Sequence, residues 1–273
     1  MSETTSLSAR ERETWNRCAE NYLDTFAYLT GESVPLLIEA SGLNGAGIQA
    51  ANKNVLEIGA GPGHVSQRFA EMGAIVTGID FSAQMVAVAQ DRYPDLTFVE
   101  ADAGNLPFDD ETFDVVIANY VVHHLEHPEK VFKEVSRVLK PNGRFVFAQW
   151  GPVEEQTSTS AFVMALETHD EIRPALMGPL HGVTERDVFA PMLSEAGLME
   201  LILNKHEINW TCETFDHVMQ GFAAWANIAS MPQDLQGRIE ASTKENLKSF
   251  EQNGQYVLPH SVMLGMAVKR GEK

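Results

Sequence analysis

Three glycines at alternate positions are the residues whose type and spacing say most about chemistry. Gly59, Gly61 and Gly63 follow an apolar run at 55–58 and precede a helical pattern that begins at His64. Glycine suits such a turn because it has no Cβ, so the backbone can bend sharply and a ligand can approach it. A dinucleotide-binding loop has the pattern G-x-G-x-x-G. Here the third glycine comes one residue early, and this spacing disfavours a nicotinamide-dependent dehydrogenase.

Polar side chains follow the apolar runs near this loop. Glu57 lies just before the first glycine, Asp80 ends the next run, and Asp102 and Asn119 end two more. Open α/β sheets bind ligands at the carboxyl ends of parallel strands, and an acid about 20 residues past the glycine loop can accept hydrogen bonds from ribose hydroxyls. Because acids outnumber bases in this set, we expect a positively charged ligand that carries a ribose and a base.

The hydrophobic pattern predicts the elements that position these residues. From Asn54 to Trp150, apolar runs of strand length alternate with helical patterns at 64–72, 82–92 and 128–139. Such alternation predicts crossover units and a parallel sheet. The strands are continuously apolar, which indicates that helices cover both faces of the sheet.

The flanking segments are less regular. Apolar residues at helical spacing predict a helix over 11–30, ended by Gly31. A helix over 184–196 is expected to have Thr184 as its N-cap. The closing strand at 255–269 contains Pro259, which suggests a bulge or an edge position.

We therefore divide the chain into three parts. Residues 1–53 form an N-terminal helical cap and connector, 54–150 the ligand-binding core, and 151–273 the remainder of the sheet. Helical lid segments are expected at 151–183 and 211–254.

Charge and composition limit the partners. Lys and Arg total 20 against 38 Asp and Glu, a net charge of −18. Because nucleic-acid affinity depends on basic residues that displace counterions, we expect no nucleic-acid partner and no docking on an anionic membrane. Cys18 and Cys212 are too few for a disulfide framework or a Cys-rich zinc site, and no metal site is expected. With no signal peptide and no run of ~18 apolar residues, the expected location is the cytoplasm.

Four longer runs share a pattern with a known family. They are VLEIGAGPG, VTGIDFS, VEADAGNLPFDDETFDVVIANYVVHHL and VFKEVSRVLKPNGRFVF. Across 54–150 the chain resembles the class I S-adenosylmethionine-dependent methyltransferases, in particular the small-molecule branch that includes quinone-biosynthesis enzymes. The resemblance implies an α/β, Rossmann-like fold with a seven-stranded, mostly parallel sheet and an antiparallel last strand. It also implies S-adenosyl-L-methionine as cofactor.

The resemblance further implies residues that bind the methionine end of the cofactor. Gly59 and Gly61 would pass close to it, with Glu57 shaping the loop. The backbone carbonyl of Asn119 would meet the ammonium group, and Tyr22 would close over the carboxylate. From the residues alone, the glycines could be a tight turn, Glu57 a solvated strand end and Tyr22 a core aromatic residue.

The nucleoside end of the cofactor is assigned in the same way. Asp80 would accept from the ribose hydroxyls, and Phe81 would pack on the adenine. Asp102 would accept from the adenine amino group beside the Ala103 amide, and Leu106 would cover the other adenine face. Each of the two aspartates could instead be a helix cap or a turn residue.

Methyl transfer asks mainly for alignment and exclusion of water, and proximity alone can supply ~7–11 kcal/mol. A base is needed only where the acceptor must lose a proton, and histidine is suited to this at neutral pH. His123 and His124, near Tyr120 and His127, border the expected methyl site and are the candidate catalytic residues. The alternative is that this histidine turn is structural.

The acceptor is expected to lie against the later helices. Five apolar side chains fall near one helical face: Phe215, Met219, Phe222, Trp225 and Ile228. They either pack on the sheet or form a lid over an acceptor pocket, with Phe162, Met164 and Met177 as possible additions.

Two hypotheses about function follow. The first is methyl transfer to a small hydrophobic or aromatic organic acceptor, with oxygen as the first choice of acceptor atom and carbon or nitrogen as alternatives. The second is a protein of the same fold that binds the cofactor but catalyses a non-methylating rearrangement or serves as a binding module. Residues 119–122 lack the Asn/Asp-Pro-Pro-aromatic motif, which disfavours methylation of nucleic-acid bases.

Overall fold

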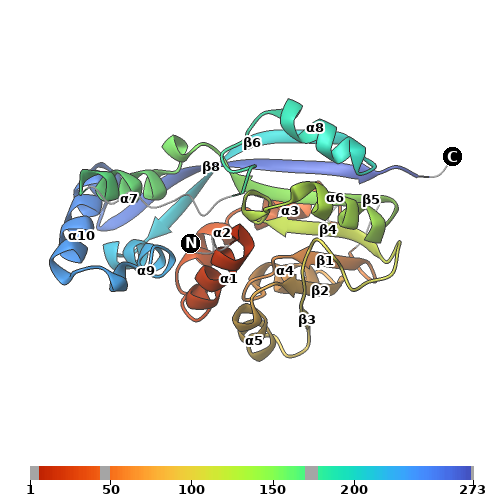
Figure 1. Ribbon diagram of the computed structural model, residues 1–273, viewed down its shortest axis with the longest axis horizontal. Coiled ribbons are helices and arrows are strands. Elements are labelled where there is room, and N and C mark those ends of the chain that lie inside the picture. Colours follow the sequence, from red (N-terminus) through yellow and green to blue (C-terminus); the bar gives the residue numbers. More distant parts are fainter. Residues whose placement is uncertain (1–5, 44–49, 170–177, 272–273) are drawn as a thin grey trace, which may run out of the picture.

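The computed structural model describes residues 6–43, 50–169 and 178–271. Its strands are β1 (Asn54–Ile58), β2 (Ile75–Asp80), β3 (Thr97–Glu100), β4 (Phe113–Asn119), β5 (Leu139–Trp150), β6 (Leu198–Cys212), β7 (Glu251–Gln252) and β8 (Gln255–Lys269). They form one sheet in the order β3-β2-β1-β4-β5-β8-β6, with the short β7 paired to β8 (Figure 1). Strands β1 to β5 are parallel, and β8 is antiparallel to both β5 and β6. The predicted Rossmann-like sheet is therefore confirmed, with β7 as an addition.

Ten α-helices lie in the described ranges. They are α1 (Leu7–Cys18), α2 (Phe26–Gly31), α3 (Val34–Ser41), α4 (His64–Glu71), α5 (Ala83–Arg92), α6 (Pro128–Val138), α7 (Thr157–Thr168), α8 (Arg186–Glu195), α9 (Phe215–Trp225) and α10 (Gln233–Leu247). Four short 3₁₀ turns are also present in these ranges, and one of them, η1 (Val122–His124), follows β4. None of these helices combines the length and apolar character needed to cross a bilayer.

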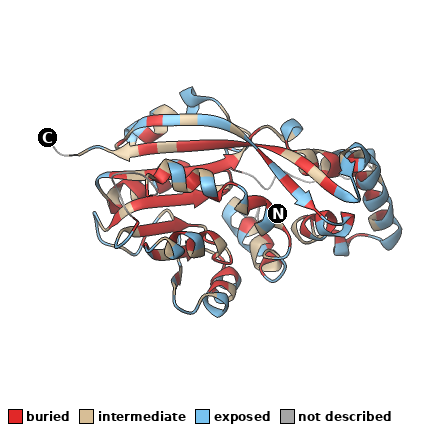
Figure 2. Cartoon of the chain, turned by 180° about the vertical axis from the view of Figure 1, so that it is seen from behind, coloured by how far each residue is buried: buried red, intermediate tan, exposed pale blue. Residues whose placement is uncertain are grey.

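Alternating side chains of the central strands enter two separate cores. Val55 and Ile117 pack in one core with Phe69 of α4, whereas Leu56 and Val116 pack in another core with residues of α6 and α8. Figure 2 shows the resulting band of buried residues along the strands. Helices thus cover both faces of the sheet, as the continuously apolar strands predict.

Two details of the predicted helices are wrong. The expected helix over 11–30 is two helices, because the chain turns after Cys18 and Thr25 bonds back to the carbonyl of Asn21 (Oγ1 to O, 2.7 Å). Helix α8 begins at Arg186 with Glu185 as its N-cap residue, so Thr184 is not the cap.

Strands β6 and β8 continue past the end of β5, and α7, α9 and α10 lie at the far end of this extension (Figure 1). Pro259 lies in this extension, where β8 pairs with β6 on one side. On the other side, Pro259 lies between the short pairing with β7 and an isolated bridge from Gln156 to His260. The predicted edge-like position of Pro259 is therefore confirmed. The predicted boundaries at 53/54 and 150/151 fall at the start of β1 and the end of β5, and the division into domains stays a prediction.

Candidate active site

A cavity of ≈ 320 Å³ lies at the carboxyl ends of β1, β2 and β4, with α1 along one side. This volume is within the range of ~300–1,000 Å³ that is typical of small-molecule sites. Nine of the eleven predicted site residues line it: Tyr22, Gly59, Gly61, Asp80, Phe81, Asp102, Ala103, Asn119 and His124. The other two, Glu57 and His123, do not.

The glycine loop has a different reason for glycine at each of two positions. Gly59 has φ +64°, and a Cβ there would overlap the side chain of Val121. Gly61 has φ +53°, but a Cβ there would meet only Met85 Sδ, at 3.9 Å. Packing thus requires glycine at 59, whereas at 61 the missing Cβ leaves open space that a ligand can occupy.

Asp80 ties the loop to the end of β2. Its Oδ2 accepts a hydrogen bond from the Gly61 amide and its Oδ1 accepts one from the Ser82 amide, both at 2.9 Å. Burial raises the pKa of this carboxyl to about 6, although the backbone hydrogen bonds act in the opposite direction. A ligand that brings hydroxyl donors or positive charge would favour the ionised form.

Glu57 lies behind the loop and not in the cavity wall. Its side chain is buried and accepts a hydrogen bond from Ser66 Oγ of α4. Burial raises the pKa of Glu57 to about 8, so its carboxyl is mostly protonated at neutral pH. The side chain of Glu57 therefore holds α4 against β1. It does not provide the carboxylate that the sequence suggested for binding a cationic ligand.

The expected nucleoside end lies beside α1. Phe81 lines the cavity with the Arg12 guanidinium 5.7 Å from its ring centroid. Asp102 accepts a hydrogen bond from the Gly104 amide (2.8 Å), which leaves its other carboxyl oxygen available. Leu106 packs in the core next to α6 and is not among the residues that line the cavity, and its contact with an adenine face stays a prediction.

The expected methionine end lies where the N-terminal helices meet β4. The Asn119 side chain accepts from Ser33 Oγ (2.8 Å) and donates to the Thr30 carbonyl (3.0 Å), so it holds the junction of α2 and α3. Tyr22 lies beside this junction with its hydroxyl 3.5 Å from Thr30 Oγ1. Burial raises the pKa of Tyr22 to about 12, which keeps it a neutral hydrogen-bonding group.

A second cavity of ≈ 80 Å³ adjoins the first, and the two share Trp15, Tyr22, Tyr120 and His124. Its remaining walls include four aromatic residues, Phe26, Trp150, Phe222 and Trp225, together with His123, Gln156, Thr159 and His181. Core strands and the α7–α9 extension both contribute to it.

The predicted lid face is partly present in this second cavity. Phe222 and Trp225 line it, and Phe162 stacks on Phe222 with ring centroids 4.7 Å apart. Phe215, Met219 and Ile228 pack in the core instead. The suggestion that Met164 joins the pocket is wrong because this residue is exposed on α7, and Met177 lies outside the described residues.

Several polar atoms around the second cavity lack a partner. Tyr120 stacks on Trp150 (3.8 Å between centroids), and its hydroxyl, Gln156 Oε1 and both ring nitrogens of His123 are buried without a hydrogen bond from any described residue. Burial also lowers the pKa of His123, so its ring is neutral. Because an unsatisfied buried polar group costs ~1–3 kcal/mol, these atoms indicate a cavity that receives a polar ligand.

Helix α1 contributes residues that the sequence interpretation missed. Ser8, Glu11, Arg12 and Trp15 line the larger cavity from one face of the helix. Their spacing of three, four and seven residues is that of a single helical stripe, and this was the signal that could have found them.

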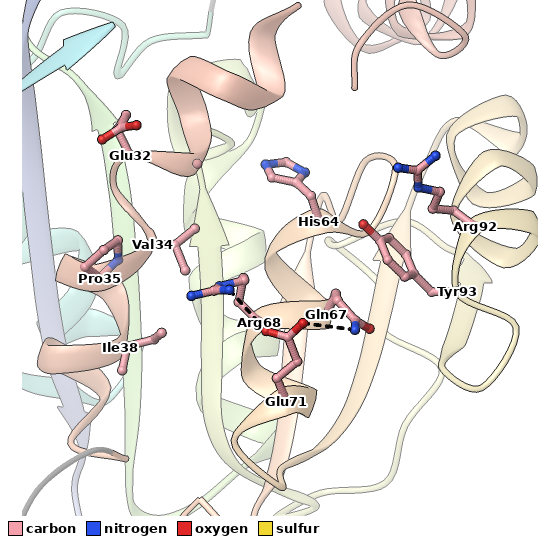
Figure 3. Close-up of a pocket in the computed structure, with 11 residues that line it drawn as sticks. Glu32, Val34, Pro35, Ile38, His64, Gln67, Arg68, Glu71, Arg92 and Tyr93 are labelled. Carbon is pink, nitrogen blue, oxygen red and sulfur yellow. Dashed lines mark hydrogen bonds and ion pairs between the residues drawn. The ribbon is translucent and has the colours of Figure 1, made fainter. Parts of the chain in front are cut away.

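A larger and more open hollow of ≈ 780 Å³ lies between α3 on one side and α4 and the end of α5 on the other (Figure 3). It shares no residue with the two cavities described above. Gln67 and Arg68 both turn toward Glu71, which neutralises the arginine (Figure 3). None of the predicted site residues lies in it.

Comparison with known proteins identifies the family. A family model described as "Methyltransferase domain" matches residues 56–147. The chain is 30% identical over 183 residues to a demethylmenaquinone methyltransferase of Paenarthrobacter aurescens, and the alignment covers 63% of this chain and 68% of that protein. The chain belongs to the class I S-adenosylmethionine-dependent methyltransferases. The predicted family, enzyme class and cofactor, S-adenosyl-L-methionine, are confirmed.

A second relative of this methyltransferase is the uncharacterized methyltransferase YcgJ of Bacillus subtilis. It is 33% identical over 137 residues, which are 48% of this chain and 52% of that protein. The crystal structure of YcgJ has a TM-score of 0.57 at 24% identity and covers 89% of this chain and 100% of that chain. This likeness supports the fold.

Proposed function

We propose that this methyltransferase transfers a methyl group to a hydroxyl oxygen of a small, largely aromatic acceptor bound in the second cavity. The observation that carries the proposal is the contact between the two cavities. They meet at Tyr22, Tyr120 and His124, so an acceptor in the smaller cavity would lie next to a cofactor in the larger one.

The larger cavity suits the cofactor by its hydrogen-bond acceptors. Asp80 would accept from the ribose hydroxyls and Asp102 from the adenine amino group, and the Asn119 carbonyl would accept from the methionine ammonium. The open space at Gly61 admits the ligand to the loop backbone. When bound, S-adenosylmethionine supplies a methyl group on a positively charged sulfur.

The acceptor class follows from the second cavity. Tyr120, Trp150 and Phe222 offer ring faces and edges for a planar molecule. The Tyr120 hydroxyl and Gln156 Oε1 would hydrogen-bond oxygen substituents that a pure hydrocarbon lacks. The cavity of ≈ 80 Å³ has room for about one ring, and a monocyclic phenol is the class that fits it best.

His124 is the better placed of the two candidate bases. It lines both cavities, whereas His123 lines only the smaller one and is fully buried. We therefore assign proton removal from the acceptor to His124, and His123 to the acceptor wall.

The test is a panel of monocyclic phenols, their methyl ethers and the matching anilines, each incubated with enzyme and S-adenosylmethionine. Formation of S-adenosylhomocysteine, measured by mass spectrometry, is expected with phenols and not with the ethers. Tyr120→Phe should raise KM for an active phenol about tenfold, because one hydrogen bond is lost. Met164→Ala, an exposed change on α7, is the control and should have no effect.

Two results would contradict the proposal. Turnover of anilines alone would make nitrogen the acceptor atom. Tight cofactor binding by calorimetry, with no S-adenosylhomocysteine from any phenol or from a metabolite extract, would favour the non-methylating alternative.

A further inference from the structure

Glu11 of α1 is a buried acid that methyl transfer as described above does not use. Only 2% of the residue is exposed, and no Lys or Arg among the described residues pairs with it. Its Oε2 accepts a hydrogen bond from Trp15 Nε1 (2.8 Å) and lies 3.1 Å from Nδ1 of His124. A buried carboxylate is costly unless it is paired and hydrogen-bonded. These two contacts offset that cost for Oε2, whereas Oε1 has no hydrogen-bond partner among the described residues.

The contacts also fix the orientation of the His124 ring. Nδ1 is buried and lies 3.1 Å from Glu11 Oε2, an ion-pair distance without a hydrogen bond, and Trp15 packs edge-on to the ring with centroids 5.2 Å apart at 87°. The ring lines both cavities, and because Nδ1 lies against Glu11, Nε2 is the ring nitrogen left to face them. An acid that holds one ring nitrogen while the other faces the substrate is the arrangement that orients a general base in catalytic triads.

The histidine and tyrosine side chains that share the cavity walls with this ring are neutral. His123 of η1 has its ring centroid 4.1 Å from that of His124, and His181 lies 5.9 Å from His123. Burial lowers the pKa of both His123 and His181, so neither ring adds a positive charge at neutral pH. Tyr22 and Tyr120, which share the cavity walls, are kept protonated because burial raises their pKa values. The carboxylate of Glu11 is thus the charge nearest to Nδ1.

We propose that Glu11 is a positioning residue that holds His124 with its proton on Nδ1 and its lone pair on Nε2, toward the acceptor. This inference rests on the proposed function for the identity of the reaction. The acceptor hydroxyl gives its proton to Nε2 while an oxygen electron pair forms the bond to the cofactor methyl. The pair of the broken carbon–sulfur bond stays on sulfur. The imidazolium is balanced by Glu11 until its proton passes to water.

The test is the tautomer of His124, measured by long-range ¹H–¹⁵N spectra of histidine-labelled protein at pH 8, with His124→Asn to assign the signals. The wild type is expected to show the Nδ1–H tautomer. Glu11→Leu removes the acceptor, and the ratio of Nδ1–H to Nε2–H should fall at least tenfold. Glu11→Gln keeps an acceptor oxygen and should retain the tautomer. Glu13→Leu, on the exposed side of the same helix, is the matched control and should match the wild type.

An Nε2–H tautomer in the wild type would overturn the proposal, and so would an unchanged ratio in Glu11→Leu. The wild-type measurement decides even where Glu11→Leu does not fold. Because the spectra need no acceptor, failure of phenol methylation and failure of this pairing are separate outcomes. With an active phenol, Glu11→Gln should lower kcat at least tenfold with little change in KM, since the imidazolium loses its balancing charge.

Discussion

Because Gly61 has no Cβ, a ligand can reach the backbone of the glycine loop. At Gly61 a Cβ would enter open cavity space, in contrast to Gly59, where it would collide with protein atoms. We expect Gly61→Ala to weaken S-adenosylmethionine binding at least tenfold, because the methyl group takes space meant for the ligand. Isothermal titration calorimetry measures this change.

Gly254→Ala is the control for the backbone. It has φ +81° with nothing within 4 Å of the added Cβ, so it carries the same left-handed penalty of about 1–2 kcal/mol far from the cavity. Both variants should lose similar thermal stability, and only Gly61→Ala should lose affinity. Equal affinities in the two variants would show that the cofactor does not approach the loop at Gly61.

Glu57 makes stability depend on pH. Its pKa is raised from 4.5 to about 8 in the folded chain, so between these values the folded state binds more protons than the unfolded state. The free energy of unfolding therefore falls as pH rises from about 4.5 to about 8, by up to about 1.4 kcal/mol per pH unit. Glu57→Gln mimics the neutral acid and should remove this slope.

Urea unfolding of wild type and Glu57→Gln at several pH values measures the difference between them. The variant should gain stability relative to the wild type with each step from pH 5 to pH 8. A constant difference over this range would mean that Glu57 is already ionised in the folded protein.

At the residue scale the sequence identified most of the candidate site because strand ends and a glycine loop leave clear signals. Asp80 and Asn119 could be placed at the same sheet edge from the alternation alone. His123 and His124 could not be separated, because successive residues of a 3₁₀ turn point about 120° apart and the direction of the turn depends on distant contacts. The burial of Glu57 against Ser66 likewise depends on how α4 packs.

Among the elements, α1 is the one whose attachment matters most to the site. Arg17 at its end donates to the carbonyls of Ala224 (2.9 Å) and Trp225 (3.3 Å) at the end of α9. Positive charge is favourable at a helix C-terminus, and hydrogen bonds from a charged group contribute about 1.5–3 kcal/mol. We expect Arg17→Ala to speed amide hydrogen exchange across 7–18 by at least tenfold and to weaken cofactor binding.

Arg68→Ala is the matched control. Its ion pair with Glu71 is exposed, with 62% and 49% of the two side chains accessible, and such pairs contribute little. Exchange in α1 should be unchanged in that variant. If Arg17→Ala also left exchange in α1 unchanged, the docking of α1 would rest on other contacts.

The extent of the N-terminal helices could not be predicted from periodicity. Trp15, Tyr22 and Phe26 fit one helical face, yet the chain turns between Cys18 and Phe26. The turn places Trp15 beside His124 and Phe26 against Phe222, with ring centroids 5.6 Å apart. Contacts with residues a hundred or more positions away outweigh the local pattern.

For the whole molecule, the excess of acidic residues acts on stability. The chain has a net charge of −18, and its acidic side chains repel one another more strongly in the compact state than in the unfolded chain. We expect the urea midpoint to rise between about 10 mM and about 1 M NaCl, as the screening length falls from ~30 Å to ~3 Å. Choline chloride should give the same rise, and a rise with NaCl alone would indicate bound sodium ions instead of screening.

The junction between the core sheet and the extension of β6 and β8 could not be predicted from the sequence either. Local pattern placed the closing strand at 255–269, but its continuation past β5 depends on pairing with β6, about 50 residues earlier in the chain. That continuation brings Phe222 and Trp225 to a cavity whose other wall is β4 and β5. A helix predicted only as an apolar face thereby becomes part of the site.

Helix α1 carries both the Ser8–Trp15 wall of the larger cavity and the carboxylate beside His124. If this helix swings aside to admit the methyl donor, Glu11 leaves the imidazole at the same moment. The enzyme would then be chemically idle while open, and the acceptor would be deprotonated only after the donor has been enclosed. The enzyme could not admit the cofactor and deprotonate an acceptor at the same time, and this would protect the sulfonium group from reaction with other nucleophiles.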